Sequence, residues 1–195
     1  MTTETRPLEG FTSISNTGTA CIQFTVSDGW QVQLSGRPED LARTYTEVRN
    51  GQLLIWQDSQ GQGSPSLNLF GLNISLGSFG KNGNGYGNSL GPVDVVIHAP
   101  AQTAWENAGT GSIEVNGSYE IEHLQIVSTG TGHFRLDGLK CSGTLGLDTR
   151  GTGSILVNGQ AAAVKARTTG LGNIGGQLHY ATIEKTALGL GRIQL

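Results

Sequence analysis

The stretch GTGSILVNG at residues 151–159 repeats two earlier stretches, GTGSIEVNG at 109–117 and GTGHFRLDG at 130–138. Shortened forms follow as GLGNIGG from residue 170 and GLGRIQL from residue 189. The first glycines of these five phrases lie 21, 21, 19 and 19 residues apart. A repeat of this length is typical of a solenoid, in which each repeat forms one coil and buries its apolar side chains against neighbouring coils.

Apolar and polar residues alternate within each phrase. The position four residues after the first glycine holds Ile113, Phe134, Ile155, Ile174 and Ile193, and the next position is polar in most repeats. A second column, four residues before each glycine, holds Trp105, Ile126, Leu147, Ala166 and Lys185. This alternation predicts strands with one buried face. We therefore expect an all-β fold, a right-handed parallel β-helix (β-solenoid) with about 20 residues per rung and its columns stacked ~4.8 Å apart.

The glycines are expected at the bends of the coil, where a side chain would clash or would require a forbidden backbone conformation. The predicted structural corners are Gly109, Gly111, Gly130, Gly132, Gly151, Gly153, Gly170 and Gly172. A second corner follows each strand as Asn116-Gly117, Asp137-Gly138 or Asn158-Gly159. Asn-Gly is also typical of a two-residue hairpin, but three such pairs in one column favour stacked coils.

A single domain over residues 1–195 is expected from the length. Residues 8–56 are interpreted as irregular N-terminal rungs, 57–91 as an insertion and 92–195 as regular GxGxI rungs. Because GSFGKNGNGYGNS at 77–89 contains almost no core residue, we expect a flexible Gly/Asn loop there. Two interpretations stay open: an interaction loop that displays Phe79, Lys81 and Tyr86, or an insertion without a ligand.

Composition excludes several classes of protein. Charged residues make up 14% of the chain and the net charge is −3, so a nucleic-acid partner is not expected. No apolar run approaches the ~20 residues that a membrane span requires, so no membrane insertion is expected. The N-terminal MTTETRPLEGF lacks a signal peptide, which predicts a cytoplasmic protein if Met1 is the native start. Cys21 and Cys141 are interpreted as buried thiols, or as a disulfide if the fold brings their Cα atoms within about 7 Å.

Chemistry-bearing residues are scattered, and we expect no cofactor, no metal and no catalytic residues. His98, His123, His133 and His179 fall in different columns and lack the ligand spacing of a zinc site. His133 should point outward beside Ser154. The column of Asn116, Asp137 and Asn158 is the one candidate for calcium. The column of Glu114 and Arg135 offers an ion pair rather than the clustered carboxylates of β-helical polysaccharide hydrolases.

The blocks DGWQVQLSGRPEDLARTYTEVRNGQLLIW at 28–56, VDVVIHAP at 93–100 and the serial GTGSIxVNG phrases stand in a distinctive order. In this order, from about Phe11 to Leu195, the chain resembles the bacterial head GIN domain family of putative autotransporter adhesins. The resemblance implies a right-handed β-helix and an exported or cell-envelope location. It also implies no established enzyme activity and no catalytic residues.

Two functions fit these features. The first is a non-enzymatic structural or adhesin-like interaction protein that forms a homo-oligomer, for which a closed trimer is one arrangement, and whose ligand is a surface glycan or protein. It rests on Ile193 and Leu195, which end the last rung without a cap. The alternative is a carbohydrate-binding or carbohydrate-cleaving β-helix. Its stacking platforms would be Trp30, Trp56, Trp105, Tyr86 or Tyr119.

Overall fold

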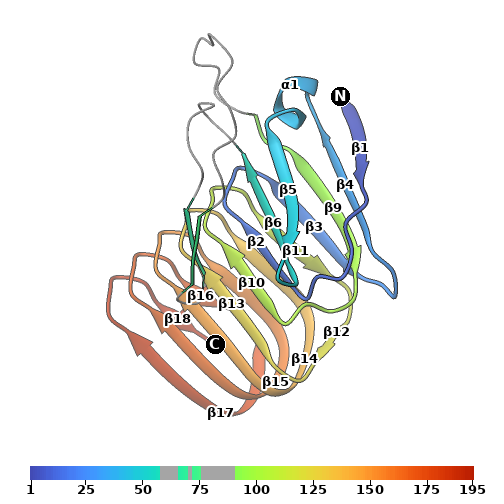
Figure 1. Ribbon diagram of the computed structural model, residues 1–195. Coiled ribbons are helices and arrows are strands. Elements are labelled where there is room, and N and C mark those ends of the chain that lie inside the picture. Colours follow the sequence, from blue (N-terminus) through green and yellow to red (C-terminus); the bar gives the residue numbers. More distant parts are fainter. Residues whose placement is uncertain (58–65, 70–71, 76–90) are drawn as a thin grey trace.

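The computed structural model describes residues 1–57, 66–69, 72–75 and 91–195, and in these residues the secondary structure is β apart from one helical turn (Figure 1). The helical turn, α1 (Pro38–Leu41), begins at a proline, whose fixed φ suits the first position of a helix. The strands are β1 (Thr2–Arg6), β2 (Ser13–Asn16), β3 (Cys21–Val26), β4 (Gln31–Gly36), β5 (Thr44–Arg49), β6 (Gln52–Gln57), β7 (Ser66–Leu69), β8 (Leu72–Ser75), β9 (Asp94–Ala99), β10 (Ala104–Asn107), β11 (Ile113–Asn116), β12 (Tyr119–Ile121), β13 (Leu124–Ser128), β14 (Phe134–Thr149), β15 (Ile155–Thr168), β16 (Ile174–Gly175), β17 (Leu178–Ala187) and β18 (Ile193–Gln194). The predicted all-β class is confirmed.

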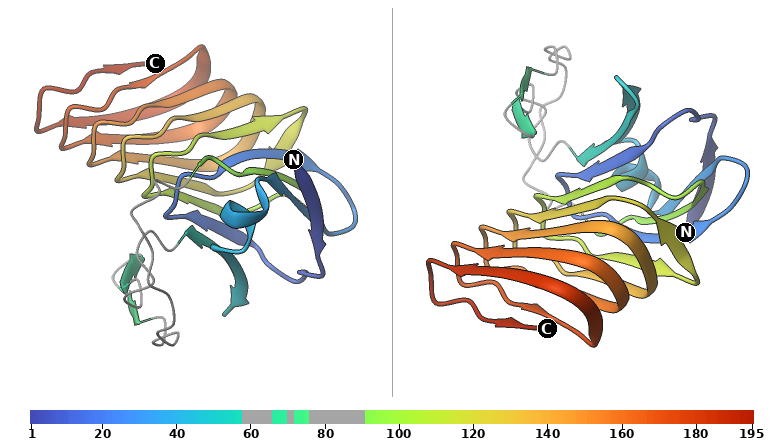
Figure 2. Two further views of the ribbon diagram at one scale, coloured as in Figure 1. Left: turned by 90° about the horizontal axis from the view of Figure 1, so that it is seen from above. Right: turned by 90° about the horizontal axis from the view of Figure 1, so that it is seen from below.

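From β10 onward the chain winds in coils whose strands pair in parallel with the coils before and after them. Figure 2 shows these coils lying one behind another toward the C-terminus. The register places Ile113 opposite Phe134, and Phe134 opposite Ile155. Asn116-Gly117 and Asn158-Gly159 therefore turn the chain within stacked coils and do not form hairpins.

The two apolar columns fill the space inside the coils. Ile113, Ile126 and Leu147 are each at most 1% exposed, as is Trp105. The Trp105 ring meets Phe24 edge-on with the ring centroids 4.9 Å apart, and Phe134 lies 5.6 Å away on its other side. Burial of such side chains contributes roughly 1.5–3 kcal/mol each, so the columns supply most of the driving force for winding the coil.

The order of the coils in space differs from their order in the sequence. The strands β2 and β3 pair in parallel with β10 and β11 on one side, and with β6 and β9 on the other. The coil containing β6 and β9 is therefore the outer one, although it follows β2 and β3 along the chain. VDVVIHAP was expected simply to restart the rungs, and it instead forms β9 on the outer side of β3.

The N-terminal end of the stack is covered by antiparallel strands. β4 pairs with β9, β1 with β4, and β5 with β6, all antiparallel. Residues 31–36 and 44–49 are thus not rungs of a parallel coil, contrary to the interpretation of 8–56. For β5 the reason is the tight turn at Asn50-Gly51, where φ values of 52° and 73° reverse the chain between β5 and β6.

The GxG corners bring the backbones of successive coils into direct contact. A Cβ on Gly130 would lie 2.0 Å from the carbonyl oxygen of Gly109, and one on Gly153 would lie 2.1 Å from that of Gly132. The same closeness holds at all the predicted corner glycines. None of these glycines has a positive φ, so close approach is what requires glycine here, whereas Gly117 and Gly138 at the other corner have φ values of 90° and 82°.

A buried polar column lies just inside the GxG corner. Its members are Asn16, Asn107, Ser128, Thr149 and Thr168, each at most 1% exposed. The Asn107 amide donates to the carbonyl oxygen of Gly111 at 2.8 Å, and the Thr168 hydroxyl donates to that of Gly172 at 3.0 Å. These bonds satisfy carbonyl groups that the bend turns away from the strand ladder.

Gly153→Val should lower the free energy of unfolding by about 3 kcal/mol or more, because the new side chain cannot fit against the backbone of the preceding coil. Urea denaturation followed by circular dichroism measures this change. Gly29→Ala is the matched control, since no atom lies within 4 Å of the added Cβ. Similar losses for the two variants would contradict the close contact at the corner.

Candidate functional site

An apolar corner marks the C-terminal end of the stack. The exposed middle residue of the GxG corner is threonine at Thr110, Thr131 and Thr152, and it becomes leucine in the last two coils. Leu171 is 55% exposed, Leu190 is 83% exposed, and the adjoining Leu188 is 69% exposed. We call these three residues the leucine corner. Clustered exposed apolar side chains of this kind mark interaction sites on soluble proteins.

The last coil leaves a strand edge beside the leucine corner. Among the described residues, β17 pairs only with β15, and β18 only with β16. The core columns reach this edge, where Ile183 and Ile193 are partly buried. An edge of this kind can accept another strand unless a local feature prevents it.

Lys185 provides such a feature. It occupies the column that begins at Trp105, directly opposite Ala166, so a charged side chain stands where the preceding coils place apolar ones. The Lys185 ammonium donates to the carbonyl oxygen of Leu195 at 3.3 Å, and the Tyr180 hydroxyl donates to the same oxygen at 3.2 Å. An inward-pointing charge at a sheet edge opposes further strand addition.

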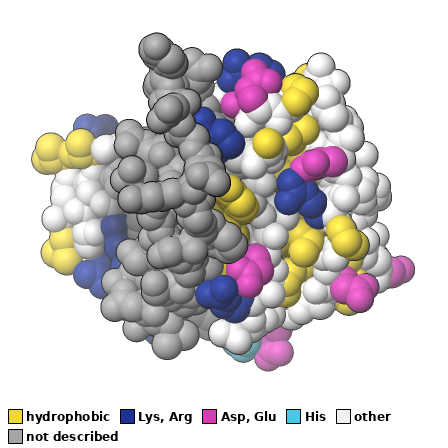
Figure 3. Space-filling model, turned by 45° about the horizontal axis from the view of Figure 1, so that its top comes forward, with side chains coloured by type: hydrophobic (Ala, Val, Ile, Leu, Met, Phe, Trp, Pro, Cys, Tyr) yellow, Lys and Arg dark blue, Asp and Glu magenta, His cyan; other side chains and the backbone are white. Residues whose placement is uncertain are grey.

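The described surface in Figure 3 carries both basic and acidic side chains, with hydrophobic side chains between them. This pattern matches the small net charge of −3.

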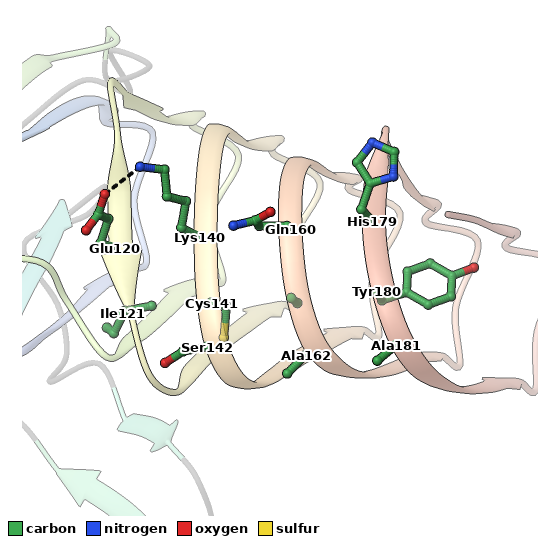
Figure 4. A pocket seen from close by; sticks show the side chains of 11 residues that line it. Glu120, Ile121, Lys140, Cys141, Ser142, Gln160, Ala162, His179, Tyr180 and Ala181 are labelled. Atoms are coloured by element: carbon green, nitrogen blue, oxygen red, sulfur yellow. Dashed lines mark hydrogen bonds and ion pairs between the residues drawn. The ribbon is translucent and has the colours of Figure 1, made fainter.

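A shallow groove of about 650 Å³ runs across β12, β14, β15 and β17 (Figure 4). One wall is a ladder of outward side chains, Glu120, Lys140, Gln160 and His179, which the register aligns on successive coils. The Lys140 ammonium lies 2.6 Å from the Glu120 carboxylate and holds the pKa of that carboxyl below its usual range. The groove is open, with small and apolar side chains beside this polar row. Its ion pair is exposed, so the pair contributes little to stability.

The aromatic side chains considered as carbohydrate platforms are mostly inside the protein. Trp105 and Tyr119 are fully buried, and Trp56 is 6% exposed. The Tyr119 hydroxyl donates to the carbonyl oxygen of Gln102 at 2.6 Å and accepts from the Trp105 ring nitrogen at 3.2 Å. These three residues cannot stack on a sugar, and the prediction that they could was wrong. Trp30, at 42% exposed, remains on the surface.

Three further site residues, Phe79, Lys81 and Tyr86, lie outside the described residues, and so does the predicted loop at 77–89.

The Asn/Asp column forms hydrogen bonds instead of a calcium site. The Asn158 amide donates to the Asp137 carboxylate at 2.6 Å, and Arg135 donates to the other oxygen of that carboxylate at 2.7 Å. Both bonds lower the pKa of Asp137. Arg135 was expected to pair with Glu114. It bonds instead to Asp137 in its own strand. Across the part of the chain that the structure describes, no three His, Cys, Asp or Glu residues gather as metal ligands.

Two other titratable residues, His133 and Glu106, have structural partners. His133 points outward and its Nδ1 lies 2.8 Å from the Ser154 hydroxyl, which confirms its predicted position. Burial raises the pKa of Glu106, whose carboxylate accepts a hydrogen bond from Ser15 at 2.9 Å. Cys21 and Cys141 are both free thiols.

Comparison with known proteins assigns the family. Residues 10–195 match the family described as "Putative auto-transporter adhesin, head GIN domain". The chain belongs to the head GIN domain family. This confirms the resemblance seen in the sequence. A search of curated proteins gives no match to this head GIN domain.

Solved structures share the fold of this head GIN domain. A "putative lipid binding protein" from Parabacteroides distasonis aligns with a TM-score of 0.61 at 15% identity, over 100% of this chain and 96% of its own. A "putative adhesin" from Bacteroides fragilis aligns with a TM-score of 0.58 at 15% identity, over 99% and 95% of the two chains. At such identities the likeness concerns the fold alone. In the described part of this head GIN domain, no helix has the length and hydrophobicity needed to cross a bilayer.

Lys185→Leu should make the last coil of the head GIN domain grow by strand addition, because the substitution extends an apolar column to an unpaired edge. Dynamic light scattering should show particles that keep enlarging as the protein concentration rises. Lys165→Leu makes the same change on the exposed outer face of the neighbouring coil and should leave particle size unchanged. If Lys185→Leu leaves particle size unchanged as well, Lys185 does not protect the edge.

Proposed function

We propose that this chain is a non-enzymatic, adhesin-like interaction domain that associates with further copies of itself through the leucine corner. The observation that carries the proposal is the change from threonine to leucine in one exposed column, at the two coils nearest the C-terminal edge. Exposed leucines at one end of a solvent-facing column do not stabilise the fold. Such leucines are expected where the column contacts another molecule.

The scaffold suits this function. In our proposal the parallel coils form a right-handed β-helix of about 20 residues per rung, since parallel strand connections are right-handed in roughly 98% of cases. Stacked coils hold side chains of one column at a fixed spacing, so two leucine corners present matching rows. The antiparallel strands at the N-terminal end favour contact through the opposite end.

Closed assembly follows from the two features of the C-terminal end. The leucine corner supplies apolar area for a symmetric contact, while Lys185 opposes open-ended strand addition. We therefore propose a discrete homo-oligomer, for which a closed trimer is one arrangement, in preference to a filament.

The absence of an enzymatic role is part of the proposal. The groove carries an exposed ion pair, and the buried Glu106 is bonded to a serine hydroxyl. Neither arrangement places a nucleophile or a second carboxylate beside a general acid. The family description, which names an adhesin, supports the same conclusion.

The double variant Leu171→Thr, Leu190→Thr restores in the last two coils the residue that the preceding corners carry, so the fold should be retained. We expect sedimentation equilibrium to show a concentration-dependent oligomer for the wild type and a monomer for this variant. Leu156→Thr is the control, because Leu156 is an exposed leucine that lies in β15 and not in the leucine corner, and its loss should leave the oligomer intact.

A wild-type chain that stays strictly monomeric at high concentration would overturn the self-association. An oligomer that survives the double variant would show that another surface forms the contact.

A further inference from the structure

Two nearly identical corners of the coil differ in how their Asn-Gly pairs are held. Asn116-Gly117 and Asn158-Gly159 end the phrases GTGSIEVNG and GTGSILVNG, and both glycines have positive φ values, 90° and 141°. The two pairs thus share sequence context and general position, and they differ in the φ value of the glycine and in their contacts.

At the second corner, both groups that could react with each other are engaged. The Asn158 amide nitrogen donates to the Asp137 carboxylate at 2.6 Å, and its amide oxygen accepts from the backbone nitrogen of Gln177 at 2.7 Å. The backbone nitrogen of Gly159 donates to the carbonyl oxygen of Gln177 at 2.9 Å.

At the first corner, both groups are free. Asn116 is exposed, and its side chain forms no hydrogen bond with any residue that the structure describes. The backbone nitrogen of Gly117 likewise donates to none of these residues, and a Cβ added to Gly117 would meet no atom within 4 Å. Nothing in this part of the chain restrains the Asn116 side chain or shields the nitrogen that follows it.

We propose that Asn116 is a site of spontaneous deamidation, with water as the only co-reactant. The backbone nitrogen of Gly117 forms a bond to Cγ of Asn116. The bond between Cγ and Nδ2 breaks, and this nitrogen leaves as ammonia with the proton that the Gly117 nitrogen gives up. Water then adds to either carbonyl of the resulting succinimide ring and yields aspartate or isoaspartate. Asparagine is among the thermolabile residues for this reason.

The product changes the corner in two ways. It adds a negative charge one coil away from Asp137, whose carboxylate is held in its ionised form by Arg135 and Asn158. The isoaspartate form also inserts a methylene carbon into the backbone path where Gly138 packs against the carbonyl oxygen of Gly117. Both effects should loosen β11, which pairs with β3 and β14 around this point.

The test is peptide mapping by mass spectrometry of the wild-type chain after incubation at mildly alkaline pH. We expect aspartate and isoaspartate to accumulate several-fold faster at residue 116 than at residue 158. Each peptide is read separately, so the Asn-Gly pair at 50–51 and those at 82–85 do not enter the comparison.

Two variants make the result specific. Asp137→Ala removes the acceptor of the Asn158 amide, so the rate at residue 158 should rise while the rate at 116 stays the same. Asn116→Gln should abolish the early product and keep the native circular dichroism spectrum. Equal rates at the two corners of the wild type, or a faster rate at 158, would overturn the proposal.

Discussion

The contact between glycine backbones at the GxG corner is the constraint on which the rest of the structure depends. A methyl group on any of these glycines would overlap severely with a neighbouring carbonyl oxygen, for example at 1.9 Å from the oxygen of Gly111 for Gly132. Only a residue without a side chain allows the coils to approach to the spacing of a parallel sheet. That spacing sets the register, and the register places Ile113, Phe134 and Ile155 over one another in the core.

The surfaces follow from the same geometry. Because every coil repeats the path of the one before, the residues at one outward position of successive repeats form a row of side chains on the surface. The row at the GxG corner is threonine along most of its length and leucine at the end, which gives the leucine corner. The row of Glu120, Lys140, Gln160 and His179 borders the groove in the same way. The inward column that starts at Trp105 ends in Lys185. Its apolar members fill the core, and its last member opposes the addition of a further strand at the edge.

The sequence was sufficient to predict the all-β class, the aligned columns and the corner glycines, because each is set by alternation and spacing within the repeat. Two features could not be predicted from it. The pairing of β6 and β9 outside β2 and β3 depends on contacts between distant segments, for which the repeat carries no signal. The burial of Trp56 and Tyr119 depends on which side of each strand faces the core at places where the alternation is short. The column that Trp105 shares with Ile126 and Leu147 already indicated that Trp105 is buried.

The buried polar column at the GxG corner could have been predicted from the sequence but was not. A polar residue stands two places before the first glycine in Asn107, Ser128, Thr149 and Thr168, and it forms the buried column at the corner. The same pattern, a polar residue two places before a glycine, also identifies Asn16 and an additional corner at Gly18-Thr19-Ala20. Ala20 stands there in the place of the second glycine, and it is fully buried.

The most direct measurement of the stacked parallel coil is a set of nuclear Overhauser contacts in solution. Stacked coils predict contacts from the Phe134 ring to the methyl groups of both Ile113 and Ile155. Strong Hα–Hα contacts between residues 113–116 and 119–121, with the Phe134 contacts missing, would show a hairpin at Asn116-Gly117 and would contradict it.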